Sequence, residues 1–138
     1  MKCLGMDLGT KTLGLATSDK LGIISSPYKV IRYEDINNLV DEVVTLIGEL
    51  KIDTLVLGYP KNMNNSLGEA VERTMRFKEL LESKVDMPIN LVDERLSTVE
   101  AENYLINEDM RREDRKKIID AVAASIILDT YLRMNKGE

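Results

Sequence analysis

Short apolar runs separated by turn-forming residues occupy the first third of the chain. Residues 3–6 are apolar and are followed by Asp7 and a Gly-Thr turn, which is typical of a buried strand. Residues 13–17 and 23–31 follow after further turns and have a similar character. Together, the three runs predict a three-stranded antiparallel meander at the start of a sheet.

Helical and strand patterns alternate in the rest of the chain. Residues 35–50 carry apolar side chains with a period of about 3.6, so they predict an amphipathic helix. Residues 54–57 and 89–92 predict two more buried strands. Ser-x-x-Glu capping boxes at Ser66 and Ser97 mark helix starts. Further helices are expected at residues 66–85, 97–106 and 115–134, with a polar, mobile loop at 107–114.

The predicted order is β-β-β-α-β-α-β-α-α. Three antiparallel strands followed by βαβ units give a mixed five-stranded sheet with helices on both faces, which is a three-layer α/β/α domain of the α/β class. A chain of 138 residues fits a single domain, 1–138. Ligands in such sheets bind outside the carboxyl ends of the parallel strands, so that edge is where chemistry is expected.

The composition excludes several classes of protein. Hydrophobic residues make up 43% of the chain and charged residues 31%, which is a globular composition. No apolar run approaches the ~18 residues of a membrane span, and no signal-peptide pattern is present, so we expect a cytoplasmic protein without a membrane partner. Cys3 is the one cysteine, which excludes an intramolecular disulfide and fits a reducing compartment.

The absence of histidine narrows the chemistry further. Mechanisms with a histidine base or a histidine metal ligand are excluded, and one cysteine cannot build a thiolate zinc or iron–sulfur site. Any metal site must use oxygen ligands, which suits Mg²⁺ or Mn²⁺. A general base would be a carboxylate, a lysine or a bound hydroxide.

The charge distribution leaves a nucleic-acid partner open. A net charge of −5 argues against such a partner, but the charge is unevenly distributed. Residues 34–49 carry five acids and no base, whereas residues 110–117 carry five bases against two acids. Carboxylates that hold divalent cations would also be neutralised in use.

Acidic residues stand at three notable positions. Asp7 ends the first predicted strand, Asp93 and Glu94 end the last one, and Asp120 lies in the last helix among alanines that would let the helix approach the sheet closely. Desolvating a carboxylate costs several kcal/mol without a partner, so acids at two strand ends of one sheet edge favour a shared cation. Turn capping, helix capping and a solvent-facing helix position are the structural alternatives for the same residues.

Four motifs in order resemble the YqgF/RuvX family over essentially the whole chain. That family has an RNase H-like fold and is described as Holliday-junction-resolvase-like nucleases, tied to maturation of the 5′ end of small-subunit ribosomal RNA. The motifs are Asp7-Leu8-Gly9-Thr10-Lys11, Leu57-Gly58-Tyr59-Pro60-Lys61-Asn62-Met63, Asp93-Glu94-Arg95-Leu96-Ser97-Thr98 and Asp120 followed by Ala123-Ala124.

The resemblance implies that Asp7, Glu94 and Asp120 are the catalytic acids and the metal ligands, with Asp93 as the adjacent alternative to Glu94. Only one of that pair should face the site, because consecutive strand residues point to opposite faces. In a nuclease, phosphate contacts are expected from basic and amide side chains near these acids. They are Lys11, Lys61, Asn62, Arg95, Arg111, Arg112, Arg115 and Lys116.

The chain departs from the family pattern at three positions. Thr12 follows Lys11 where the family often has arginine, which removes a possible phosphate contact. Asn65 replaces a loop glycine, which is tolerable because asparagine also visits left-handed conformations. Ala123 stands where resolvase relatives can carry a second acid, so the number of metal ions stays open.

The leading hypothesis is a Mg²⁺- or Mn²⁺-dependent endonuclease that processes the 5′ end of pre-16S rRNA, with ribosomal precursor particles as further partners. A resolvase of branched DNA is the alternative substrate hypothesis, and it would need two sites, whereas we expect a monomer or a weak homodimer. Nucleotide binding of the actin/sugar-kinase type shares an Asp-x-Gly-Thr loop but needs a second lobe that 138 residues cannot supply. A third hypothesis is a non-catalytic RNA-binding ribosome-assembly factor.

Overall fold

In the computed structural model, five strands form one mixed sheet in the order β3-β2-β1-β4-β5. The structure describes residues 1–60, 68–93 and 112–136. Strands β1, β2 and β3 pair as an antiparallel meander, and β1, β4 and β5 pair in parallel. The strands are β1 (Cys3–Leu8), β2 (Thr12–Ser18), β3 (Ser25–Arg32), β4 (Thr54–Tyr59) and β5 (Ile89–Asp93). The predicted mixed five-stranded sheet is confirmed.

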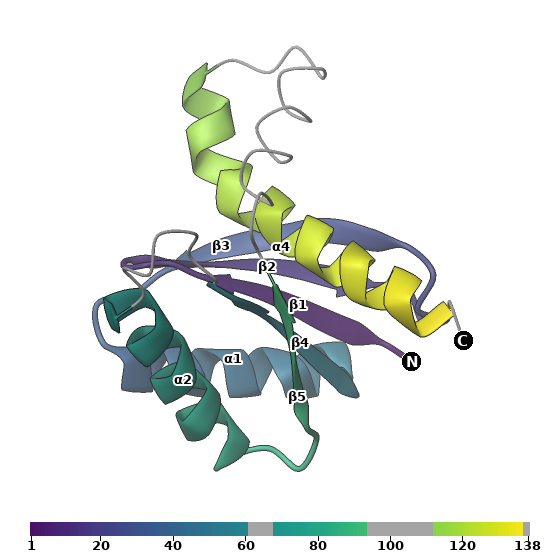
Figure 1. Ribbon diagram of the computed structural model, residues 1–138, viewed down its shortest axis with the longest axis horizontal. Coiled ribbons are helices and arrows are strands. Elements are labelled where there is room, and N and C mark those ends of the chain that lie inside the picture. Colours follow the sequence, from purple (N-terminus) through teal and green to yellow (C-terminus); the bar gives the residue numbers. More distant parts are fainter. Residues whose placement is uncertain (61–67, 94–111, 137–138) are drawn as a thin grey trace.

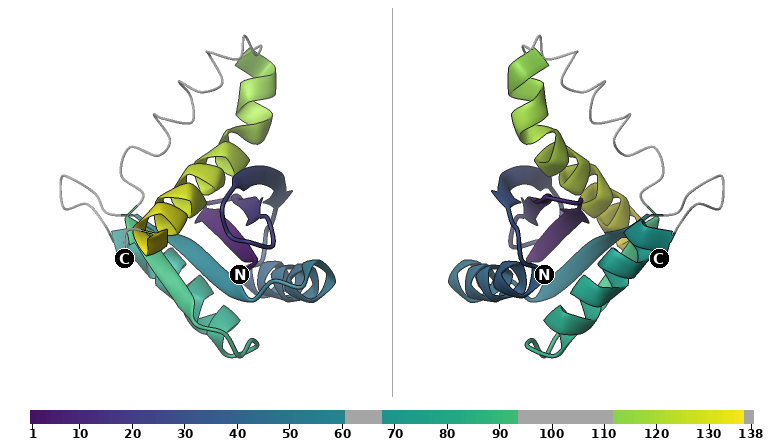
Figure 2. Two further views of the ribbon diagram at one scale, coloured as in Figure 1. Left: turned by 90° about the vertical axis from the view of Figure 1, so that its right-hand side faces the viewer. Right: turned by 90° about the vertical axis from the view of Figure 1, so that its left-hand side faces the viewer.

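Helices cover both faces of this sheet. Helices α1 (Ile36–Leu50) and α2 (Gly68–Glu82) lie on one face, and α4 (Arg112–Lys136) crosses the other (Figure 1). The first turns of α4 extend beyond the sheet (Figure 2). No helix in these described ranges is long and apolar enough to span a membrane.

Near the carboxyl end of the chain, the helices expected from the sequence can be compared with the structure only in part. Helix α4 starts three residues earlier than expected, because arginine and glutamate are good helix formers and extend it into the segment expected to be a loop. The helix expected at 97–106 lies outside the described residues, as does most of the loop expected at 107–114.

Successive side chains of β1 point alternately into two hydrophobic cores, one on each face of the sheet. Leu4 and Met6 pack in the core under α1 and α2, whereas Cys3 is buried in the core under α4. Gly5 also faces α4, since a Cβ atom built on it would lie 2.8 Å from the Cβ of Leu128. Asp7 is the next residue in that alternation, so its side chain belongs to the α4 face.

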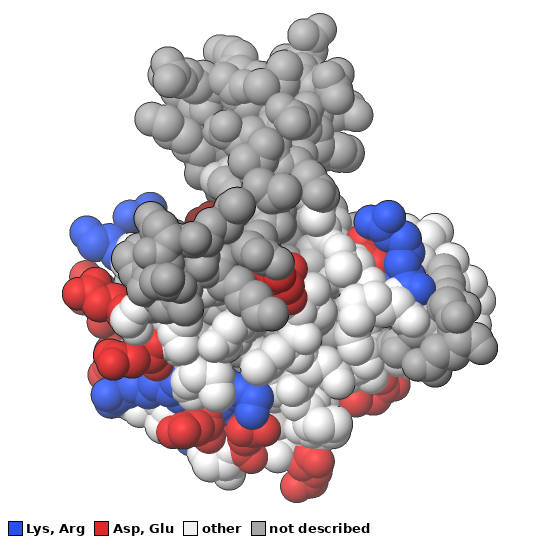
Figure 3. Space-filling model, viewed as in Figure 1, with Lys and Arg blue, Asp and Glu red and all other residues white. Residues whose placement is uncertain are grey.

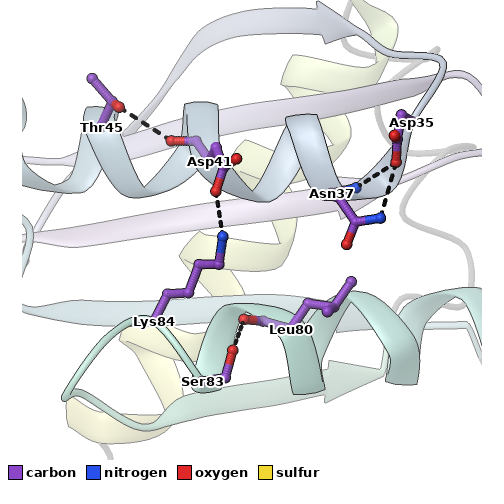
Figure 4. A network of polar contacts seen from close by, with 7 residues as sticks. All are labelled: Asp35, Asn37, Asp41, Thr45, Leu80, Ser83 and Lys84. Atoms are coloured by element: carbon purple, nitrogen blue, oxygen red, sulfur yellow. Dashed lines mark hydrogen bonds and ion pairs between the residues drawn. The ribbon is translucent and has the colours of Figure 1, made fainter.

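Polar contacts hold the layer formed by α1 and α2. Asp35 caps α1, and its carboxylate accepts a hydrogen bond of 2.9 Å from the backbone N–H of Asn37. Lys51 ends the helix in the left-handed conformation at φ 56°. Lys84, just beyond α2, forms an ion pair with Asp41 of α1 (Figure 4). These contacts place part of the acidic segment 34–49 on the far side of the sheet from α4.

The backbone of α4 lies directly against β2. A Cβ atom at Gly14 would be 2.0 Å from the carbonyl oxygen of Asp120 and 2.9 Å from the amide nitrogen of Ala121. Real Cβ atoms do not come so near to backbone atoms, so this crossing requires glycine in the strand. The alanines of α4 allow the approach from the helix side, and Gly14 allows it from the sheet side.

Replacing Gly14 with alanine should separate α4 from the sheet. We expect Gly14→Ala to lower the free energy of unfolding by about 3 kcal/mol or more, since overpacking against rigid backbone is costly. Urea unfolding measures the change. Gly48→Ala is the matched control, because no atom lies within 4 Å of a Cβ there and α1 should gain up to about 1 kcal/mol from the better helix former. Equal stabilities of the two variants would contradict the close crossing.

Candidate functional site

The close crossing brings Asp7 and Asp120 to one place. Asp7 lies near the carboxyl end of β1 and pairs with Gly14 of β2 in the antiparallel register. Since paired residues face the same side, the Asp7 side chain points where Gly14 meets the backbone of Asp120. Both acids are half-buried. Two carboxylates from residues far apart in the sequence therefore share one edge of the sheet, under the first half of α4.

Thr12 holds the carboxylate of Asp120 in position. The hydroxyl of Thr12 donates a hydrogen bond of 2.6 Å to Oδ2 of Asp120. Thr12 lies on β2 two residues from Gly14, so it faces α4 as well. Sequence reasoning noted Thr12 only as a lost phosphate contact, and this role was missed. A hydroxyl two residues before a glycine in a strand that contacts a helix acid is the signal that could have revealed it.

The turn between β1 and β2 is fixed from two sides. The N–H of Gly9 donates to the carbonyl of Thr12 at 2.8 Å, which closes the turn. The hydroxyl of Tyr33 donates to the carbonyl of Gly9 at 2.5 Å, and burial raises the pKa of Tyr33 above its ordinary value. Lys11 is exposed on this turn. The segment after Asp7 is therefore well defined without any ligand.

Asp93 faces away from Asp7 and Asp120. Val92 is buried in the core under α4, and Ile89 is buried in the core under α1 and α2. By the alternation of β5, Asp93 shares the face of Ile89. The other acid of the pair, Glu94, lies outside the described residues.

The expected phosphate contacts are only partly described. Arg112, Arg115 and Lys116 belong to the first turns of α4, where the structure describes the backbone and not the side chains. Asp129, nine residues beyond Asp120 and on the opposite side of α4, pairs with Arg133 at 2.8 Å. Lys61, Asn62, Arg95 and Arg111 lie outside the described residues.

The donor set suits a hard divalent cation. Asp7 and Asp120 offer carboxylate oxygens on one face, and oxygen ligands are those that Mg²⁺ and Mn²⁺ prefer. Within residues 1–60, 68–93 and 112–136, no three acidic, cysteine or histidine side chains form a cluster suited to a metal ion. A complete site therefore needs a ligand from elsewhere in the chain, from the solvent or from the substrate.

Two solved structures of resolvases have folds similar to that of this chain. The structure of Thermus thermophilus RuvC in complex with a Holliday junction substrate matches with a TM-score of 0.64 and 13% identity, covering 99% of this chain and 96% of that chain. A fowlpox virus resolvase complexed with Holliday junction DNA matches with a TM-score of 0.59 and 12% identity, covering 98% and 99%. The fold is thus the RNase H-like fold of the RuvC-type resolvases.

Sequence relatives are much closer than these structures. A Geobacillus sp. (strain WCH70) protein named "Putative pre-16S rRNA nuclease" is 45% identical over 134 residues, covering 96% of this chain and 97% of its own length. A Lactiplantibacillus plantarum protein of the same name is 44% identical over 135 residues, covering 96% and 94%. The RuvX family, described as Holliday junction resolvase, matches residues 1–134. The chain belongs to the RuvX family, as its four motifs indicated.

Removing the Thr12 hydroxyl should release Asp120. Hydrogen bonds to charged groups contribute ~1.5–3 kcal/mol, and this one is half-buried, so we expect Thr12→Val to lower the free energy of unfolding by about 1–2 kcal/mol. Thr12→Ser keeps the hydroxyl and should stay close to the wild type. Urea titrations of the three proteins make the comparison, and a valine variant as stable as the serine variant would contradict the bond.

Proposed function

We propose that this protein is a divalent-cation-dependent nuclease that acts in 5′-end processing of pre-16S rRNA during ribosome biogenesis. The single observation that carries the proposal is the contact between Gly14 and the backbone of Asp120, which supports a shared site for the helix acid and for Asp7, the register partner of Gly14. Relatives 42–45% identical to the chain are named for pre-16S rRNA nuclease activity, which supports this substrate over others.

Asp7, Asp120 and Glu94 are the residues that would hold Mg²⁺ or Mn²⁺. We favour Glu94 over Asp93 because side chains alternate along β5, and this alternation puts Asp93 on the face covered by α1 and α2, away from Asp7 and Asp120. A divalent cation supplies, when bound, activation of the attacking water and neutralisation of charge on the phosphodiester. Thr12 fixes one oxygen of Asp120, so that carboxylate is oriented before any substrate arrives.

The basic and amide side chains around this edge would bind the phosphate backbone. Lys11 is on the turn beside Asp7, and the first turns of α4 carry further basic residues close to Asp120. Contacts of this kind position a nucleic acid without reading its sequence. The full set is Lys11, Lys61, Asn62, Arg95, Arg111, Arg112, Arg115 and Lys116.

Cleavage of branched DNA is the second candidate function. The description of the family as Holliday junction resolvase supports it, and so does the fold shared with resolvases bound to junction DNA. A resolvase must cut two strands and needs two sites, whereas rRNA processing needs one. A cytoplasmic protein that is a monomer or a weak homodimer, acting on ribosomal precursor particles, is the arrangement that we propose.

The nuclease proposal is tested by exchanging two of the three candidate acids, Asp7 and Glu94, for their amides. We expect Asp7→Asn and Glu94→Gln to lower Mg²⁺-dependent cleavage on the order of 100-fold or more, since even the outer partners of metal ligands cost 10–100-fold when lost. Asp93→Asn and Asp129→Asn are the matched controls and should keep most of the activity. Initial rates on a labelled RNA with the precursor 5′ end and on a four-way DNA junction separate the two candidate substrates.

Two results would contradict the proposal. Undiminished turnover by folded Asp7→Asn protein would exclude the metal-dependent nuclease mechanism. Tight RNA binding without cleavage by the wild type, with any divalent cation, would instead favour the non-catalytic assembly factor.

A further inference from the structure

A cavity of about 670 Å³ lies at the end of the sheet, next to the turn that follows Asp7. Lys11 and Arg32 line it, together with Thr10, Tyr33 and Glu34. Figure 3 shows basic side chains at the left-hand edge of the described surface, where β1 ends, beside a group of acidic ones. Nothing in the motifs of the chain pointed to Arg32, because it lies outside all four.

The pairing of β2 with β3 brings the two basic residues together. Arg32 is the register partner of Thr12, and the N–H of Tyr33 donates to the carbonyl of Lys11 at 3.0 Å. The side chains of Lys11 and Arg32 are exposed, and neither has an ion pair or hydrogen bond with the residues that the structure describes. Two positive charges that line one cavity repel each other, so an anion bound between them would be stabilising.

Arg32 shares a face with the candidate catalytic acids. Its neighbour Ile31 packs in the core under α1 and α2, so Arg32 points to the α4 side. Its partner Thr12 faces that side and binds Asp120. Arg32 is displaced from Asp7 by two strand spacings of ~4.8 Å and by two residues along the strands, so the two residues lie roughly 12 Å apart. Arg32 would therefore meet a different phosphate of the strand from the one held at the candidate acids.

Arg73 contributes a third positive charge close to Tyr33, one of the lining residues. Arg73 of α2 lies near enough to Tyr33 to act on its pKa, in the lowering direction, against the larger effect of burial. The Nε atom of Arg73 is buried and has no hydrogen-bond partner. Glu34 is the one acid among the described lining residues, and it forms no ion pair with Lys11 or Arg32. The described lining of the cavity therefore carries two positive charges and one negative charge, although the protein has a net charge of −5 and Asp35 and Glu42 line an adjacent hollow.

We propose that Lys11 and Arg32 form a phosphate-binding subsite for the nucleic-acid strand, a few nucleotides away from the phosphodiester that is cut. The subsite rests on the proposed nuclease function, which supplies the polynucleotide. Arg32 binds the backbone through its guanidinium, and Tyr33, held by the Gly9 carbonyl, forms a fixed wall. The same cationic chemistry would also accept a free phosphate or a mononucleotide, and the experiment distinguishes these sources.

The test compares Arg32→Ala with Lys29→Ala. Both variants remove one positive charge from β3, but Lys29 does not line the cavity and sits 6.0 Å from the ring centroid of Tyr28. Binding to labelled RNA and to a four-way DNA junction is titrated at several salt concentrations without divalent cations. We expect Arg32→Ala to reduce the slope of log affinity against log salt by about one unit, and Lys29→Ala to leave it unchanged. Thermal melting should be the same for both variants, because exposed charges contribute little to folding.

Other outcomes would overturn the subsite. An unchanged slope in Arg32→Ala means that Arg32 does not contact the nucleic-acid backbone. An equal reduction of the slope in both variants means that binding depends only on the overall charge of the protein. Inorganic phosphate and a mononucleotide are titrated in parallel by NMR. Saturable shifts at Lys11 and Arg32 with either one, alongside an unchanged RNA slope, would assign the cavity to a free phosphate. Because no cleavage is measured, a reduced slope supports the subsite even if the protein proves inactive as a nuclease.

Discussion

The contact between the backbone of α4 and Gly14 of β2 is the constraint on which the site depends. At this crossing a carbonyl oxygen of the helix occupies the space of a missing side chain. Because Gly14 is also the register partner of Asp7, the same contact fixes the helix acid relative to the strand acid. A longer distance between helix and sheet would leave Asp120 out of reach of Asp7, with no change in the order of the strands.

Two carboxylates held close together repel one another unless something compensates. Thr12 donates a hydrogen bond to the carboxylate of Asp120, and Asp7 also takes part in a polar interaction. Such an arrangement does little for stability on its own, and it is what a site for a divalent cation requires. The alternation of β5 adds a further restriction, since it turns Asp93 toward the face where α1 and α2 lie.

The fold could be predicted from the sequence because its signals are local. The apolar runs gave the strands, the 3.6-residue period gave α1, and the alanines around Asp120 suggested a close approach. Gly14, Thr12 and Arg32 were missed because their roles depend on the cross-strand register, which periodicity does not contain. Asp93 remained an alternative to Glu94 for the same reason, since excluding it requires knowing which face each residue of β5 occupies.

The unequal distribution of charge follows the two faces of the sheet. Most of the acidic segment 34–49 belongs to α1, on the opposite side of the sheet from the candidate acids, whereas Glu34 lines the cavity beside Lys11 and Arg32. Basic residues lie instead at the end of β1, at the end of β3 and in the first turns of α4. A net negative protein can therefore present a positive edge to nucleic acid, where the local potential matters more than the total charge.

Paramagnetic broadening by Mn²⁺ tests the central claim most directly, because it locates a cation without requiring a substrate. In ¹⁵N-labelled protein titrated with substoichiometric Mn²⁺, the account predicts that the amide signals of Asp7, Gly14 and Asp120 broaden first, and that Asp7→Asn abolishes this local effect. Broadening centred instead on the acidic residues of α1, or equal broadening over the whole surface, would contradict a cation site where α4 crosses the sheet.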